Sequence, residues 1–197
     1  MTKKQLQIHI DGAKRAGKTT VAKGIINELK KRNLKPVLID MDEVRTKIFG
    51  KDTGKPDSAE SLRYRHVIAK IICDVLTPAV LNSGGTPVVV MDHDFDQTYD
   101  QIKVLSRRFR TSLKFILVES PSFEEAKRRA ELMSSDDYSD MVDWSDKKIQ
   151  ASFIRSVNRV EDYYRKITEP NLIKISQDNI NQMIKKAVRF TLNKSKK

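Results

Sequence analysis

The chain has 197 residues, a single cysteine, a formal net charge of +12 and a sequence pI near 9.7. This length suits one α/β domain that buries its core without a metal or disulfide, and the lone Cys73 excludes a disulfide within the chain. No apolar run approaches the ~18 residues that a membrane span needs, and no signal-like segment begins the chain. We expect one soluble, cytoplasmic domain over residues 1–197 with no membrane contact, and the charge favours an anionic partner.

A glycine-rich loop follows the first predicted strand. Residues 12–19 match the pattern G-x-x-x-x-G-K-[ST] at every fixed position. Leu6, Ile8 and Ile10 alternate as in a strand, and apolar residues recur with helical spacing over residues 21–29. Strand, loop and helix therefore occur in the order that a phosphate-binding loop requires.

The start of that helix predicts a polyphosphate site. Backbone N–H groups without helical partners point into the loop, and the helix dipole adds partial positive charge. We expect Lys18 to contact the β- and γ-phosphates of ATP and the Thr19 hydroxyl to hold Mg²⁺. The residues expected to bind ATP are Gly12, Ala13, Lys14, Arg15, Ala16, Gly17, Lys18, Thr19 and Thr20.

Four further apolar runs predict the remaining strands. They cover residues 37–40, 86–91, 113–118 and 172–175, and helical patterns separate them. One of these patterns predicts a long helix from Ala59 to about Leu81, kinked near Pro78. Strands that alternate with helices predict an α/β fold of three layers around a five-stranded parallel sheet.

An acidic segment lies in the second half of the chain. Residues 134–146 contain five aspartates and no lysine or arginine, and we interpret them as a mobile lid. The helix before this segment is expected to begin with Ser122 as its N-cap and Glu125 three residues later, and it carries Arg128 and Arg129. A basic tail, residues 194–197, ends the chain.

Together these segments resemble the P-loop kinases of small molecules and nucleic acids. The loop at residues 12–19, the Asp42-x-x-Arg45 cluster after the second strand and the arginines before the lid carry the resemblance. Residues 39–45 are similar to the D-x-D-x-V-R motif of adenylylsulfate kinases and to the acidic-x-x-Arg motif of polynucleotide 5′-hydroxyl kinases. The resemblance implies a P-loop NTPase fold of the nucleoside-monophosphate-kinase-like type, and its specific motifs lie mainly in the first hundred residues.

In both families the aspartate that matches Asp42 lies near the acceptor hydroxyl. The resemblance therefore implies that Asp42 acts as a general base or orients the hydroxyl, and that Arg45 binds an anionic group of the substrate. An alternative remains open, in which Asp42 caps a helix that begins at Glu43 and pairs with Lys47.

Asp92 follows the third predicted strand and favours the polynucleotide-kinase branch. The resemblance implies that it binds substrate, holds Arg45, or binds Mg²⁺ through water, and an acidic turn is the plain alternative. A lone histidine beside it, His93, does not indicate a zinc site.

Three arginines are further candidates. Arg63 lies in a stretch similar to the substrate-binding segment of adenylylsulfate kinases, although Ser58 and Ser61 stand where that pattern has other residues. Arg128 and Arg129 precede the lid, where related kinases place arginines that neutralise the transferring phosphoryl group. A solvated helix face explains either of these two equally well.

The sequence thus predicts an ATP-dependent kinase that phosphorylates a hydroxyl of a nucleotide or a nucleic-acid end. An adenylylsulfate-kinase-like enzyme acting on a 3′-hydroxyl is the alternative, and a nucleotide-dependent RNA-binding ATPase or switch is an alternative of another class. Arg107, Arg108 and Arg110 surround Phe109 and form a basic cluster, for which a solvated helix terminus is favoured over a nucleic-acid contact.

Overall fold

A computed structural model gives the fold of residues 4–50, 59–91, 95–131, 145–166, 171–177 and 179–193. Its five strands form one sheet in the order β2-β3-β1-β4-β5, and every neighbouring pair is parallel. The strands are β1 (Leu6–Gly12), β2 (Pro36–Asp40), β3 (Thr86–Val90), β4 (Ser112–Val118) and β5 (Leu172–Ile175). The predicted α/β fold with a five-stranded parallel sheet is confirmed.

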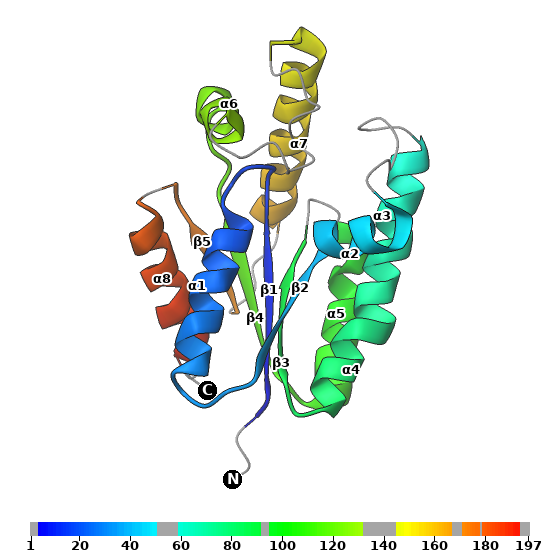
Figure 1. Cartoon of the computed structure of the whole chain (residues 1–197), viewed down its shortest axis with the longest axis vertical. Coiled ribbons are helices and arrows are strands. Elements are labelled where there is room, and N and C mark those ends of the chain that lie inside the picture. The colour runs from blue at the N-terminus through cyan, green and yellow to red at the C-terminus, as the bar shows by residue number, and fades with distance from the viewer. Residues whose placement is uncertain are drawn as a thin grey trace.

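Helices cover both faces of the sheet (Figure 1). They are α1 (Lys18–Lys30), α2 (Met41–Phe49), α3 (Ala59–Ile71), α4 (Thr77–Asn82), α5 (Phe95–Phe109), α6 (Phe123–Glu131), α7 (Lys147–Lys166) and α8 (Ile180–Leu192). The helices α1 and α8 pack on one face, while α3, α4 and α5 pack on the other. The two faces bury separate apolar clusters, as a parallel sheet requires.

The helices α1 and α8 approach each other closely. A Cβ atom at Gly24 would lie only 2.6 Å from Cγ2 of Ile184, so the glycine allows the two helices to meet. Their contact continues through the apolar cluster that includes Val21, Ile25 and Met183, all buried. The packing of this pair therefore depends on a residue without a side chain.

The predicted kink near Pro78 takes the form of a π-helical turn, η1 (Ile72–Leu76), between α3 and α4. In this turn the N–H of Thr77 donates to the carbonyl of Ile72, five residues earlier. Proline cannot donate a backbone hydrogen bond and its ring crowds the preceding turn, so a widened turn accommodates it. Cys73 lies in this turn, where burial raises the pKa of its thiol to about 12.

The central strand β1 is buried on both faces, and the alternation of Leu6, Ile8 and Ile10 marks only one of them. Its other face carries Gln7, His9 and Asp11, which are all buried. The amide nitrogen of Gln7 lies 2.9 Å from Nε2 of His9 and donates to it, because an amide nitrogen carries no acceptor. Burial lowers the pKa of His9 to about 3.

Several predicted segments fall outside this part of the chain. They are Asp92 and His93, residues 134–144 of the expected lid and the basic tail 194–197. The last residue of the expected lid, Asp146, is described, and its carboxylate accepts the N–H of Lys148 at the start of α7. No helix within the described ranges is long and apolar enough to cross a membrane.

His9 predicts acid sensitivity of the fold. A histidine with a folded pKa of about 3 stays neutral in the folded chain, while the unfolded chain takes up a proton below pH 6.5. Stability therefore falls as the pH falls, by about 2 kcal/mol between pH 7 and pH 5 for this one group. Urea unfolding of wild type and His9→Asn at both pH values measures how much the free energy of unfolding falls between pH 7 and pH 5. We expect this fall to be about 2 kcal/mol smaller in the variant.

The matched control is His66→Asn, which removes an exposed histidine from α3. It should keep the pH dependence of wild type. Equal pH dependence in wild type and His9→Asn would contradict the assignment to His9.

Candidate active site

The glycine-rich loop leaves the sheet at the carboxyl end of β1. Gly12 has a φ of 149°, and a Cβ atom there would lie 2.3 Å from the carbonyl oxygen of Val118 in the neighbouring strand β4. No side chain fits between these two backbones, so glycine is required for the strand to pair up to its last residue. The first fixed position of the motif thus has a packing reason that is independent of any ligand.

The loop then delivers the chain to the N-terminus of α1. Gly17 is the N-cap with a left-handed φ of 94°, and no side chain described here caps this helix start. Nζ of Lys18 donates to the carbonyls of Gly12 (2.9 Å) and Ala13 (3.1 Å), so the lysine lies across the mouth of the loop. Uncapped N–H groups and a lysine beside them suit an anion with several oxygens.

A hydrogen bond joins this loop to the end of β2. The hydroxyl of Thr19 donates to Oδ2 of Asp40 at 2.9 Å, and Oδ1 of Asp40 accepts the backbone N–H of Asp42 at 3.0 Å. Asp40 is therefore the N-cap of α2 and the partner of the predicted metal-binding threonine. Asp40 is the first acid of the D-x-D pattern in residues 39–45, and the sequence alone predicts no role for it.

The geometry of Asp42 overturns the alternative that it caps a helix beginning at Glu43. The helix α2 begins at Met41, and Asp42 lies inside it. Oδ1 of Asp42 lies 3.0 Å from Nη2 of Arg45, while Lys47 pairs with Glu43 at 2.7 Å instead. Asp42 is well exposed at 66% and the Arg45 side chain only at 18%, so the carboxylate faces solvent beside a largely buried guanidinium.

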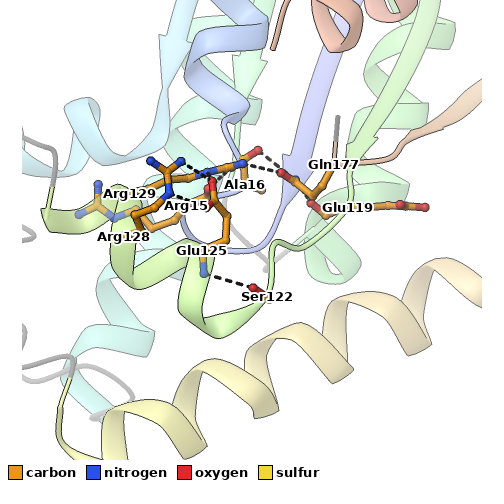
Figure 2. A network of polar contacts seen from close by, with 8 residues as sticks. All are labelled: Arg15, Ala16, Glu119, Ser122, Glu125, Arg128, Arg129 and Gln177. Atoms are coloured by element: carbon orange, nitrogen blue, oxygen red, sulfur yellow. Dashed lines mark hydrogen bonds and ion pairs between the residues drawn. The ribbon is translucent and has the colours of Figure 1, made fainter. Parts of the chain in front are cut away.

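A network of polar contacts supports the glycine-rich loop from behind (Figure 2). The guanidinium of Arg129 donates to three groups: Oε1 of Glu125 (2.7 Å), the carbonyl of Arg15 (2.9 Å) and Oε1 of Gln177 (3.0 Å). Arg15 has a positive φ of 65°, a conformation that is unfavourable for a side chain with a Cβ atom. The bond from Arg129 stabilises the carbonyl of this strained residue.

Gln177 comes from the segment after β5 and acts on the same loop. Its amide nitrogen donates to the carbonyl of Ala16 at 3.2 Å and to the carbonyl of Glu119. Gln177 thus ties the glycine-rich loop to the ends of β4 and β5, and the sequence analysis did not identify it. A glutamine in an irregular segment has no motif signal, because its partners are backbone groups far away in the chain.

Glu125 organises the two arginines of α6. Its carboxylate accepts Nε of Arg128 at 2.7 Å and Nε of Arg129 at 2.7 Å, and its own N–H donates to the Ser122 hydroxyl at 3.2 Å, as the predicted cap requires. Hydrogen bonds from Arg128 and Arg129 lower the pKa of Glu125 to about 2. The carboxylate therefore stays charged and holds both guanidinium groups near the loop.

An open cavity of about 370 Å³ adjoins the start of α1. One wall is apolar and comes from α8, where Met183 is buried and Ile180 is partly exposed. The opposite wall is charged and comes from α6. The lining residues are Gly17, Thr20, Glu125, Arg128, Arg129, Ile180 and Met183.

The remaining predicted residue, Arg63, lies on α3 and is exposed. No contact in the described part of the chain joins it to the pair of Asp42 and Arg45. Its predicted role in substrate binding, like that of Asp92, stays a prediction.

The cap of α2 generates the first prediction for this site. Replacing Asp40 by alanine removes the cap of α2 and the partner of Thr19, and we expect the free energy of unfolding to fall by about 1–2 kcal/mol. Asp42→Ala removes an ion pair whose carboxylate is exposed, and it should cost less than about 1 kcal/mol. Urea unfolding of both variants measures the difference, and a larger loss for Asp42→Ala would contradict the assignment of the cap.

The second prediction concerns Gln177. Gln177→Ala removes donors to two carbonyls and the acceptor of Arg129, so the amides of residues 15–18 should exchange with solvent about five- to tenfold faster. Hydrogen–deuterium exchange with mass spectrometry measures this rate. Gln182→Ala, at an exposed position on α8, is the control and should exchange as wild type does. Unchanged protection in Gln177→Ala would show that the loop is ordered without this network.

No protein-family model matches the chain, and no curated protein matches it in sequence. Solved structures match it over nearly its whole length. They include a sugar kinase from Janibacter sp. (16% identity, TM-score 0.56, 94% of both chains). They also include the APS kinase of Mycobacterium tuberculosis (12%, 0.60, 96% of this chain and 99% of that one) and shikimate kinase from Acinetobacter baumannii (14%, 0.61, 95% and 93%). The chain therefore has the fold of the P-loop kinases.

Proposed function

We propose that this protein is an ATP-dependent phosphotransferase that moves the γ-phosphoryl group of ATP to a hydroxyl of a small anionic acceptor or a nucleic-acid end. The observation that carries the proposal is the hydrogen bond between Thr19 and Asp40. It joins the phosphate-binding loop after β1 to the end of β2, where Asp42 and Arg45 follow within about one helical turn. The proposed donor and acceptor sites would thereby be adjacent, and the fold shared with kinases supports the proposal.

The donor half is built from the loop, α1 and the cavity beside them. The uncapped N–H groups at the start of α1 and the Lys18 ammonium would bind the phosphates of ATP. The cavity would take the base, since Ile180 and Met183 give it an apolar wall and Arg128 a planar cation to stack on the ring. Arg129 is bonded to loop carbonyls, so we assign it to positioning the loop.

Thr19 and Asp40 fit a magnesium ion. Their oxygens lie 2.9 Å apart at the mouth of the loop, and hard oxygen ligands are those that Mg²⁺ prefers. The described ranges contain no cluster of three or more His, Cys, Asp or Glu side chains that would hold a metal. Few protein ligands are typical of Mg²⁺ in phosphoryl transfer, because phosphates and water supply the others. When bound, the ion would neutralise charge on the β- and γ-phosphates.

The acceptor half consists of Asp42 and Arg45. Asp42, exposed and negative, would accept the proton of the acceptor hydroxyl as its oxygen attacks the γ-phosphorus. The bond between the acceptor oxygen and the γ-phosphorus forms while the bond between the γ-phosphorus and the β–γ bridging oxygen breaks, and ADP leaves. Arg45, next to Asp42, would bind an anionic group of the acceptor and place the hydroxyl.

The acceptor is therefore defined by a hydroxyl together with an anionic group. A nucleotide or the 5′-hydroxyl end of a nucleic acid meets this description, and adenylylsulfate is the alternative. The compounds named with two structural neighbours, APS and shikimate, are also anions with hydroxyl groups. A nucleotide-dependent ATPase or switch that phosphorylates no acceptor is the competing function.

One experiment separates these possibilities. Purified protein with Mg²⁺ and γ-labelled ATP is offered 5′-hydroxyl DNA and RNA, adenylylsulfate, nucleosides, nucleotides, shikimate and gluconate, and label in each acceptor is counted. Transfer to one acceptor well above the rate of hydrolysis supports the kinase. ATP hydrolysis with no labelled acceptor would support the switch instead.

Two substitutions test the assignments of residues. Lys18→Ala should lose phosphoryl transfer by at least about 100-fold, and Asp42→Asn should lose turnover by about 100- to 10,000-fold while ATP binding is kept. ATP binding by calorimetry and the rate with the best acceptor measure these effects. The control Glu43→Gln changes the next carboxylate on α2 and should act as wild type. Full activity in Asp42→Asn would sink the general-base assignment.

A further inference from the structure

We propose that the rim of the sheet formed by the amino ends of its strands, opposite the glycine-rich loop, binds the sugar–phosphate backbone of a nucleic acid. We name this surface the basic edge and define it by Lys4, Arg32, Lys35, Arg107 and Arg110. It lies at the amino ends of the strands, whereas the candidate active site lies at their carboxyl ends (Figure 1). The proposal concerns binding alone and does not depend on kinase activity.

Three of these cations stand close to the starts of strands. Lys4, Lys35 and Arg110 lie one or two residues before β1, β2 and β4. Backbone hydrogen bonds connect these entries: the N–H of Thr86 donates to the carbonyl of Lys35 (2.8 Å), and the N–H of Ser112 donates to the carbonyl of Gln5 (2.7 Å). The sheet therefore holds the three cations along one line.

The other two cations come from helix ends that reach the same edge. Arg107 lies in the last turn of α5, and Arg32 lies in the turn that follows α1. All five side chains belong to exposed residues. None of them forms an ion pair with an acid in the described ranges, whereas the neighbouring Lys31 pairs with Glu28 at 2.5 Å. The described segments that enter or leave the sheet at this edge carry no Asp or Glu.

The spacing suits a polymer of phosphates. Strands β2 and β4 are three positions apart in the sheet, and neighbouring strands lie about 4.8 Å apart, so the line from Lys35 to Arg110 extends about 14 Å. Each strand of a duplex advances about 3.4 Å along the helix axis per phosphate, so this line covers the axial length of about four phosphate steps. A single phosphate ion would engage only one end of it.

Helix dipoles explain only part of the basic edge. Cations near the carboxyl ends of α1 and α5 are stabilised by the helix, which accounts for Arg32 and Arg107. Lys4 and Lys35 precede strands, which have small net dipoles, so no local backbone charge favours a cation there. Lys4 and Lys35 therefore add positive charge beside Arg32 and Arg107 although the helix dipoles do not stabilise these two lysines.

A nucleic acid fits this surface better than a lipid membrane does. Membrane-surface binding depends on apolar side chains that insert between lipids, in addition to cations. The exposed apolar side chains near these cations are two valines, Val37 (41%) and Val104 (60%), which insert less apolar surface into lipid than leucine or an aromatic ring, and Phe109 is only partly exposed. The guanidinium of Arg108 lies 5.5 Å from the centre of the Phe109 ring, so a cation lies beside this ring at the surface.

The basic edge lies far from the candidate active site, so the net charge of +12 does not by itself indicate a nucleic-acid substrate. The cations of the basic edge lie one strand length, roughly 20 Å, from the glycine-rich loop. They do not help to place a nucleic-acid end beside Asp42. A nucleic acid bound there is therefore a second partner of the protein, and its binding should not require the ATP site.

The test is a charge reversal with a matched control. The edge variant carries Lys4→Glu, Lys35→Glu and Arg107→Glu, and the control carries Lys70→Glu, Lys147→Glu and Lys185→Glu, which change exposed lysines on α3, α7 and α8 by the same total charge. The probes are fluorescent 20-nucleotide single-stranded RNA and DNA of mixed sequence, titrated from 50 to 300 mM salt. Thermal unfolding of both variants shows that they fold.

We expect the edge variant to bind at least tenfold more weakly at 50 mM salt. The slope of log K against log salt should become shallower by about two, because each lost phosphate contact removes about 0.7. The control and Lys18→Ala should keep a slope close to that of wild type. Equal weakening in edge and control variants, no binding by wild type, or preferential binding to phosphatidylserine vesicles would each overturn the proposal.

Discussion

A parallel sheet covered by helices on both faces is the constraint on which the rest of this structure depends. Every residue of β3 is buried, and so is nearly all of β1, so neither face is open to a ligand. Charged side chains are therefore directed to the two rims where strands begin and end. The carboxyl rim carries acids together with bases. The connections described at the amino rim carry bases alone, and Glu28, in the last turn of α1, is paired with Lys31. The candidate active site and the basic edge lie at these two rims.

The support of the glycine-rich loop is also a consequence of this sheet. The loop follows β1, and the chain after β4 and β5 passes beside it because these strands complete the same rim. Arg129 and Gln177 reach the loop from those two later segments and bond its carbonyls. A network that fixes the carbonyl side of the loop preorganises its amide side for an anion.

Much of the fold could be predicted from the sequence, because its signals are local. Five apolar runs separated by helical patterns gave the five strands within two residues, and the fixed positions of the motif placed the loop. The sequence left open whether Asp42 caps α2, because Asp40 and Asp42 are both good caps, and only the end of β2 decides for Asp40. The roles of Gln177 and of the polar face of β1 were missed for another reason. Gln177 bonds a carbonyl 161 residues away, and no periodic pattern records such a contact.

The close approach of α1 and α8 at Gly24 has a consequence for the cavity beside the loop. The apolar wall of that cavity belongs to α8 and its floor to the start of α1, so the contact of the two helices sets the distance between that wall and the floor. That distance is determined by van der Waals contact between a bare backbone and an isoleucine, which neither pH nor salt alters. Packing thus fixes the apolar wall, while the charged wall from α6 is held by the ion pairs of Glu125 with Arg128 and Arg129, which salt screens. Added salt should therefore loosen one side of the site and leave the other in place.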